Sequence, residues 1–78
     1  MSEGAPVVDV RGMACSDAVV RLHRTLMPLP EGAAVVVRAE APEVIGDLRR
    51  YARRAGHRWG EEAARPGGVT EVEVMRGA

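Results

Sequence analysis

The fold is decided by residues 7–19, which read VVDVRGMACSDAV. The first part, Val7–Val10, is mostly β-branched and predicts a short strand. Arg11–Ala14 contains a glycine and interrupts the strand pattern. From Cys15 onward the apolar residues recur at intervals of three and four, which is helical spacing. The stretch therefore predicts a strand that turns directly into a helix, with the single cysteine of the chain at the junction.

The end of this helix and the elements after it follow from proline, glycine and apolar-run signals. Pro28 and Pro30 end the first helix, because proline cannot continue the hydrogen-bond ladder. Residues 33–39 are nearly all apolar and predict a strand at an inner position of a sheet. Ala41–Glu43 opens a second helix, since proline is favoured in the first turn, and Gly56 ends it.

Two further strands complete the predicted fold. Residues 57–63 give a weak strand pattern, and residues 69–75 alternate valine with glutamate, which is typical of a strand with one solvent-facing side. A turn at residues 65–68 joins them. The resulting β-α-β-α-β-β order predicts an α/β (α+β) two-layer sandwich, in which a four-stranded mixed sheet carries both helices on one face. Strands one and two should be parallel, and the last two antiparallel.

The composition limits what a chain of 78 residues can do. It has no phenylalanine, one tryptophan and one tyrosine, so the core must be aliphatic and thin. Such a core leaves little room for an enclosed active site, and any chemistry should therefore lie at the surface. The formal charge of zero argues against general nucleic-acid or membrane binding on electrostatic grounds.

The single cysteine, the first residues and the short apolar runs together favour a cytoplasmic protein with a reduced thiol. A single cysteine cannot form an intramolecular disulfide or build a cysteine-clustered metal site. The first residues, MSEGAPVV, lack the pattern of a signal peptide. No apolar run approaches the roughly 18 residues of a membrane span. We therefore expect no metal, no organic cofactor and no membrane contact.

Cys15 is the candidate reactive residue. It lies where the first strand turns into the first helix, and the free helical N–H groups and the positive end of the dipole favour a thiolate there. A persulfide is also an anion, so the same position would stabilise it. Asp17 opposes ionisation, because its negative charge lies within one turn of the sulfur. The competing interpretation is a small buried hydrophobic residue, a role common among free cysteines.

Four arginines crowd the second predicted helix: Arg49, Arg50, Arg53 and Arg54. They cover its outer side, where a solvated face is the ordinary interpretation. The alternative is a docking surface for an acidic partner protein or for RNA. RNA is the weaker alternative, because no aromatic residue accompanies the arginines to stack on bases.

The two histidines carry weaker signals. His57 follows the end of the second helix, where the helix dipole favours an imidazolium, and we assign it a structural role. His23 projects from the first helix, and we assign it no role.

The opening stretch resembles that of the TusA/SirA-type sulfur-carrier family. That family begins with an apolar-Asp strand, a Gly-apolar-x step and a Cys-Pro-x-Pro motif at the start of the first helix. Residues 15–18 read Cys-Ser-Asp-Ala here, so both motif prolines are replaced. The resemblance continues in the Pro-Gly turn at residues 29–32, the acidic-x-Pro helix entry at residues 39–42 and the Asp-apolar pair Asp47–Leu48. It covers residues 7–76 in the same element order.

This resemblance implies a function and a division of the chain. A single sulfur-carrier-like domain would span residues 7–76, between a flexible N-terminus at residues 1–6 and a short tail at residues 77–78. Cys15 would hold sulfur as a persulfide. The sulfur would come from a cysteine desulfurase or a rhodanese-like protein and pass to an acceptor enzyme. The pathway would be tRNA thiolation, molybdenum-cofactor maturation or sulfur oxidation.

The remaining candidate residues surround that cysteine. Asp17 occupies the variable position of the motif and is a possible modulator of Cys15. Partner docking is assigned to Met13, Ser16, Arg49, Arg50 and Arg53. We expect a stoichiometric shuttle, as a monomer or a weak homodimer, rather than an enzyme with ordinary turnover.

Two other functions remain open at this point. The missing motif prolines are compatible with an interaction or regulatory domain that keeps the fold and has lost sulfur transfer. Cys15 could also be a redox switch that forms an intermolecular disulfide, in which case the resolving thiol comes from another chain.

Overall fold

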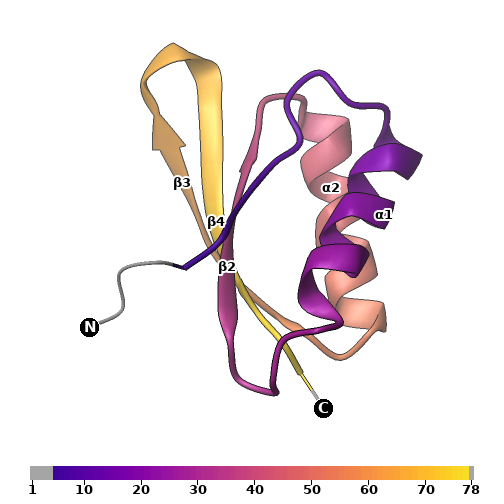
Figure 1. The fold of residues 1–78 in the computed structure, drawn as a ribbon. Helices are drawn as coiled ribbons and strands as arrows, with labels where there is room; N and C mark the ends of the chain where they lie inside the picture. Colours follow the sequence, from indigo (N-terminus) through magenta and orange to yellow (C-terminus); the bar gives the residue numbers. More distant parts are fainter. Residues whose placement is uncertain (1–4, 78) are drawn as a thin grey trace.

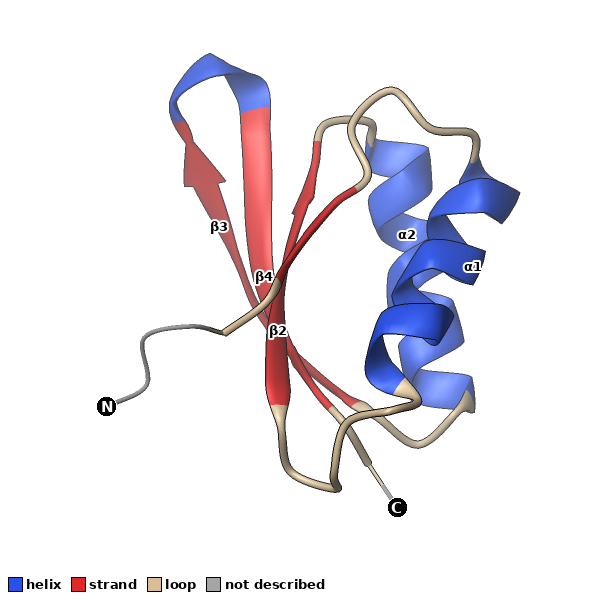
Figure 2. Ribbon diagram, in the orientation of Figure 1, coloured by secondary structure: helices blue, strands red, loops and turns tan. Residues whose placement is uncertain are grey.

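The computed structural model describes residues 5–77, and their elements follow the predicted β-α-β-α-β-β order. The elements are β1 (Val7–Asp9), α1 (Cys15–Leu26), β2 (Ala34–Ala39), α2 (Pro42–Arg54), β3 (Arg58–Arg65) and β4 (Val69–Met75), with a 3-10 turn at Pro66–Gly68. Figure 1 shows α1 and α2 side by side on one side of the sheet, and Figure 2 separates the helical layer from the strand layer. The predicted fold class is confirmed. Residues 1–4 of the predicted flexible N-terminus, and residue 78 of the tail, lie outside the described residues.

The four strands form one mixed sheet in the order β1-β2-β4-β3. β1 and β2 are parallel, as a crossover through α1 requires, and the other neighbours are antiparallel. The inner position predicted for residues 33–39 is confirmed, because β2 lies between β1 and β4.

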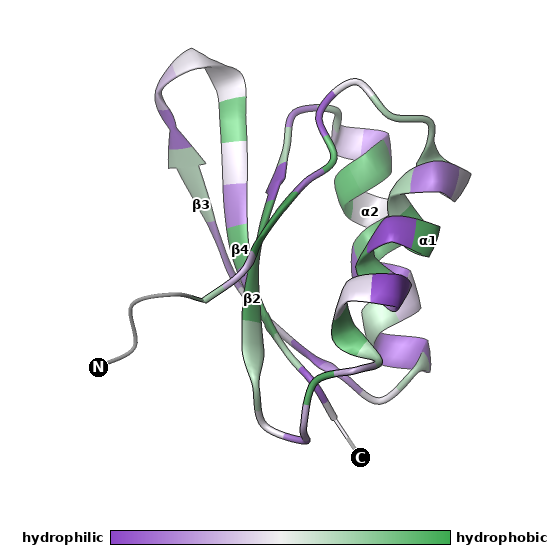
Figure 3. Cartoon of the chain, viewed as in Figure 1, coloured by the Kyte–Doolittle hydropathy of each residue, from purple (hydrophilic) through white to green (hydrophobic). Residues whose placement is uncertain are grey.

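The core is the aliphatic layer between the sheet and the two helices. Along β2 the buried residues alternate with partly exposed ones, as expected for a strand with one covered face. α1 contributes Leu22 and Leu26 and α2 contributes Leu48, and all three are fully buried. Ala18 is fully buried as well, so the small residue in the first turn of α1 faces the sheet. Figure 3 shows β2 as largely hydrophobic, whereas hydrophilic residues recur along the helices.

A small polar cluster joins α2 to β3. Glu62 accepts a hydrogen bond from the Trp59 indole Nε1 at 2.9 Å and another from the Arg49 guanidinium at 2.5 Å. The register of β3 against β4 shifts between Trp59 and Glu62, which indicates a bulge. β3 begins at Arg58 and continues to Arg65, two residues beyond the predicted strand. Trp59 and Glu62 are thereby both directed toward α2.

His57 is buried at the junction between α2 and β3, with 8% of its surface exposed. Its Nδ1 accepts a hydrogen bond from the Gly77 N–H at 2.9 Å. Burial, together with the nearby Arg76 and His23, lowers the pKa of His57 below the ordinary value of 6.5. The expected imidazolium is therefore wrong, because loss of solvation disfavours the charged ring here.

None of the helices within residues 5–77 is long and apolar enough to cross a membrane.

Candidate functional site

The loop between β1 and α1 is a braced turn that presents Cys15. The Met13 N–H donates to the Val10 carbonyl at 3.1 Å, and Gly12 supplies the positive φ of 79° within this turn. Arg11 binds both carboxylate oxygens of Asp9, through Nε at 2.9 Å and an Nη at 2.8 Å. These hydrogen bonds lower the pKa of Asp9 to about 2. The ion pair ties Asp9, at the end of β1, to Arg11 in the turn that leads to the cysteine.

Cys15 is the first residue of α1, and Ala14 precedes it in an extended conformation without a side-chain cap. The two residues that replace the motif prolines differ in what their N–H groups do. The Ala18 N–H donates to the Ala14 carbonyl at 2.9 Å, which is the first hydrogen bond of the helix and one that proline could not make. The Ser16 N–H belongs to the first turn, where helical N–H groups have no acceptor within the helix. Of the two N–H groups gained, only that of Ser16 is left for an anionic sulfur.

Cys15 lies at a hollow formed by α1 and α2. The thiol is partly buried. The hollow has a volume of about 620 Å3 and is lined by Cys15, Ser16, Val19, Val20, Asp47, Arg50, Tyr51 and Arg54. It therefore combines an apolar wall from α1 with one carboxylate and two guanidinium groups from α2.

The charges around Cys15 act against ionisation. The Asp47 carboxylate is the largest cause of a Cys15 pKa above the ordinary value for cysteine. Burial and the negative charges of Asp47 and Glu43 raise the pKa further. The backbone N–H contact at the start of the helix lowers it, but by less. The carboxylates of the neighbouring helix therefore outweigh the backbone at the start of α1, and the pKa of Cys15 lies above the ordinary cysteine value.

Asp47 is itself held as a carboxylate. The neighbouring Cys15 and Arg50 side chains both lower its pKa. The Arg50 guanidinium lies 2.5 Å from Asp47 Oδ1. Tyr51 lies in the same hollow, and its hydroxyl is 2.9 Å from His23 Nδ1. The site thus contains two polar pairs: Asp47 with Arg50 within α2, and Tyr51 with His23 between the two helices.

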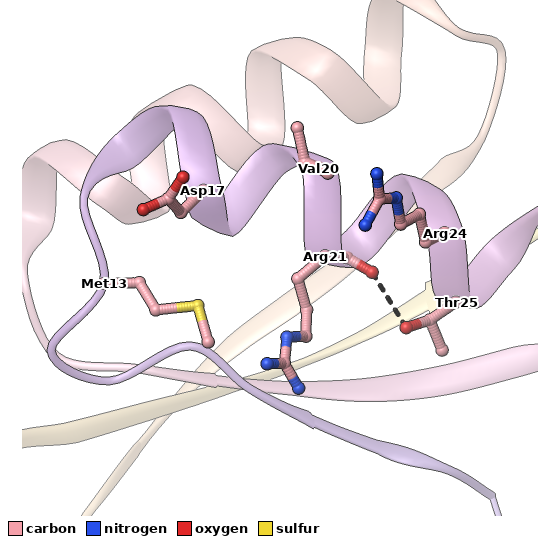
Figure 4. Close-up of a pocket in the computed structure, with 6 residues that line it drawn as sticks. All are labelled: Met13, Asp17, Val20, Arg21, Arg24 and Thr25. Atoms are coloured by element: carbon pink, nitrogen blue, oxygen red, sulfur yellow. Dashed lines mark hydrogen bonds between the residues drawn. The ribbon is translucent and has the colours of Figure 1, made fainter.

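The other predicted site residues lie in three places. Ser16 and Arg50 share the hollow with Cys15. Met13 and Asp17 instead line a second hollow, with Val20, Arg21, Arg24 and Thr25 (Figure 4). Arg49 is engaged by Glu62, and Arg53 lies on an adjoining surface with Arg49, Arg50 and Arg54. The predicted set is therefore brought together only in part.

Sequence reasoning did not identify Asp47, Tyr51 or Arg54 as site residues. A signal was present, since Asp47, Arg50, Tyr51 and Arg54 recur at intervals of three and four and so share one face of α2. The spacing alone does not show that this face of α2 is directed toward Cys15 and α1. Within residues 5–77, no group of three or more His, Cys, Asp or Glu side chains is placed to hold a metal ion.

Comparison with known proteins decides the family. The sequence matches the family described as sulfurtransferase TusA over residues 7–76. The chain belongs to the TusA sulfurtransferase family. A solved structure of a SirA-like protein from Desulfitobacterium hafniense has a TM-score of 0.80 and is 27% identical in sequence. The match covers 92% of this chain and 97% of that protein. No curated protein matches the sequence significantly.

Membership of the TusA family confirms the resemblance found in the sequence and supports a general role as a sulfur carrier or sulfurtransferase. Members of such a family exchange sulfur with donor and acceptor proteins. Cys15, at the start of α1, is the only cysteine in the chain and so the only thiol on which this TusA-family member could carry sulfur.

Proposed function

We propose that this protein is a cytoplasmic sulfur carrier that holds sulfur as a persulfide on Cys15. The observation that carries the proposal is the position of the single cysteine of a TusA-family chain, at the first residue of α1 and at the edge of an open hollow. The outer sulfur would extend about 2 Å from the cysteine sulfur, which is the length of an S–S bond. Arg50 and Arg54 line the same hollow, and their positive charges would favour the anionic persulfide.

The transfer is an exchange of one S–S bond for another. The Cys15 thiolate attacks the outer sulfur of a persulfide on the donor, and a bond to Cys15 forms as the S–S bond of the donor breaks. The donor leaves as a thiolate, which takes up the proton that Cys15 has lost. An acceptor thiolate then attacks the outer sulfur on Cys15, and Cys15 regains a proton. Neither step consumes an oxidant or a reductant, and neither needs a metal or an organic cofactor.

The partners follow from the same proposal. The donor is a cysteine desulfurase or a rhodanese-like protein, and the acceptor belongs to tRNA thiolation, molybdenum-cofactor maturation or sulfur oxidation. Docking involves Met13 and Ser16 on either side of Cys15, together with the arginine surface of α2. That surface comprises Arg49, Arg50, Arg53 and Arg54 around Gly46. Its charge fits an acidic partner protein, so that binding should weaken as the salt concentration rises.

One observation favours a second function. The neighbouring Asp47 carboxylate raises the pKa of Cys15, and a protonated thiol is a poor nucleophile. A domain that has lost sulfur transfer and serves only for protein interaction would also tolerate this arrangement.

Sulfur loading separates the two functions. The purified protein is incubated with a cysteine desulfurase and cysteine, or with polysulfide, and its intact mass is measured beside that of Cys15→Ser. The carrier function predicts a gain of one sulfur atom that a reducing agent removes, in the native protein alone. No gain from either donor, with Cys15 still open to alkylation, would sink the carrier function and support the interaction domain.

A further inference from the structure

Tyr51 joins α2 to α1 at the hollow that holds Cys15. Its hydroxyl lies 2.9 Å from His23 Nδ1 on α1, and the two rings meet edge to face with their centres 6.0 Å apart. The Tyr51 side chain also lines the hollow, together with Val19 and Val20 of α1. The two helices are therefore tied by a hydrogen bond from a residue that forms part of the wall of the hollow.

The Tyr51 ring is held from a second direction by His57. The centres of these two rings are 5.8 Å apart, and the ring planes are inclined by 53°. His57 is buried, and its Nδ1 accepts a hydrogen bond from the Gly77 N–H. Tyr51 thus has one ring partner on α1 and another at the junction between α2 and β3, so its side chain is fixed in place.

The buried packing beneath the two helices is aliphatic, with Leu22 and Leu48 fully buried. Aliphatic contacts stabilise the helix pair without a preferred direction, whereas a hydrogen bond weakens steeply when its geometry changes. His23 and Cys15 belong to the same helix, about two turns apart. The hydrogen bond that fixes His23 against α2 therefore also fixes where α1 presents Cys15.

We infer that Tyr51 is a positioning residue for sulfur transfer at Cys15. Through His23 it fixes α1 relative to α2, and so the opening through which the persulfide of a partner protein reaches the sulfur of Cys15. The inference rests on the sulfur-carrier function proposed above. It also gives His23 a role that the sequence did not predict.

The effect depends on the kind of donor. A protein donor is docked on the surface of the carrier, so its persulfide has one approach to Cys15, and a misplacement of about 1 Å can cost about a hundredfold in rate. Polysulfide diffuses freely and reaches the sulfur from any open side of the hollow. Loss of the hydrogen bond between the helices should therefore slow transfer from a protein and leave loading by polysulfide unchanged.

Tyr51→Phe tests the inference, because it removes the hydroxyl and keeps the ring against His57. The donor is a cysteine desulfurase or a rhodanese that carries a persulfide, mixed with rising concentrations of the carrier in a single-turnover reaction followed by intact mass. The maximal rate should fall about tenfold. The carrier concentration that gives half of this rate should stay within about twofold, since the arginine surface is untouched. Loading by polysulfide should match that of the native protein.

Three further variants assign the effect to one hydrogen bond. His23→Leu removes the other partner and should slow transfer by the same factor. The double variant should be no slower, because the two residues share a single interaction. Thr25→Val is the matched control on α1, since it removes a hydroxyl that donates to the Arg21 carbonyl at 2.8 Å, and its transfer rate should equal the native one. Circular dichroism verifies that each variant keeps its helices.

The outcomes separate this inference from the function beneath it. A native maximal rate in Tyr51→Phe would overturn the role of Tyr51 and leave the carrier function intact. An equal loss with the protein donor and with polysulfide would overturn it too, because the hydroxyl would then act on the reactivity of Cys15 or on the fold. Native uptake from polysulfide alone would remove the protein donor, and the inference with it. No native uptake from any donor, with Cys15 open to alkylation, would sink the carrier function as well.

Discussion

Gly12 adopts a φ of 79° in the turn that leads from β1 to Cys15. A Cβ added at this position would meet no atom within 4 Å, so a substitution changes only the backbone preference. A left-handed conformation costs an L-residue about 1–2 kcal/mol. Gly12→Ala should therefore lower the free energy of unfolding by about 1–2 kcal/mol, measured by urea denaturation monitored through Trp59 fluorescence.

Gly46 provides the opposite case within α2. It has helical neighbours on both sides, and its added Cβ would lie 3.9 Å from the Arg49 guanidinium, which is an ordinary contact. Gly46→Ala should raise the free energy of unfolding by about 0.5–1 kcal/mol, because glycine is the weaker helix former. Equal effects of the two substitutions would contradict the conformational explanation for Gly12.

The site could be predicted at this scale only in part. Cys15 stands out because it is the only cysteine and because the helical pattern begins at it. Asp47 does not stand out, because its role depends on how α1 and α2 rotate against each other. The packing of the buried Leu22, Leu26 and Leu48 sets that rotation. It cannot be predicted from the spacing of charged residues along one helix.

At the scale of elements, the contact between α2 and β3 depends on one carboxylate. Glu62 accepts hydrogen bonds from Trp59 and Arg49, and both lower its pKa. Glu62→Gln should change the emission of Trp59, since its indole N–H loses a charged acceptor. The free energy of unfolding should fall by about 1 kcal/mol at most, because the ion pair is partly exposed and screened by solvent.

Glu61→Gln is the control for this experiment, because it changes the charge of an exposed neighbouring side chain on β3. It should leave the emission of Trp59 unchanged. If both variants shifted the emission equally, the effect would come from the charge of β3 in general and not from the hydrogen bond of Glu62.

The same strand shows why the elements were predicted with unequal accuracy. Residues 33–39 have a nearly continuous apolar pattern, and the structure places them at the inner position expected of it. β3 has no such pattern, because it lies at the edge of the sheet and its bulge interrupts the alternation between Trp59 and Glu62. A period of two cannot be read across an inserted residue, and the predicted strand accordingly ended two residues early.

At the scale of the whole molecule, His57 links the end of α2 to the C-terminal segment. Its Nδ1 accepts the Gly77 N–H, so the hydrogen bond requires a neutral ring with a free lone pair at that atom. Protonation would remove this acceptor and place a buried cation close to Arg76, whose charge also lowers the pKa of His57. Acid should therefore break the hydrogen bond that holds the C-terminal segment against the end of α2.

The sign of this effect follows from the lowered pKa. The unfolded chain binds the proton at the ordinary histidine value of 6.5, and the folded protein binds it only at a lower pH. The stabilisation is therefore complete above pH 6.5 and is lost as the pH falls through the folded-state pKa. Thermal unfolding followed from neutral pH downward should show the melting temperature fall in this window. The carboxyl groups of Asp9, Asp47 and Glu62 titrate below their ordinary values of 3.8 to 4.5, so their contribution is lost at lower pH.

Two variants identify the group responsible. His57→Gln keeps an acceptor for the Gly77 N–H but cannot take up a proton, so its melting temperature should depend less on pH in this window. His23→Gln changes the exposed histidine of α1 and should keep most of the dependence. If His57→Gln lost stability with acid as steeply as the native protein, another group would control the transition. The buried ring would then only fill space between α2 and the C-terminal segment.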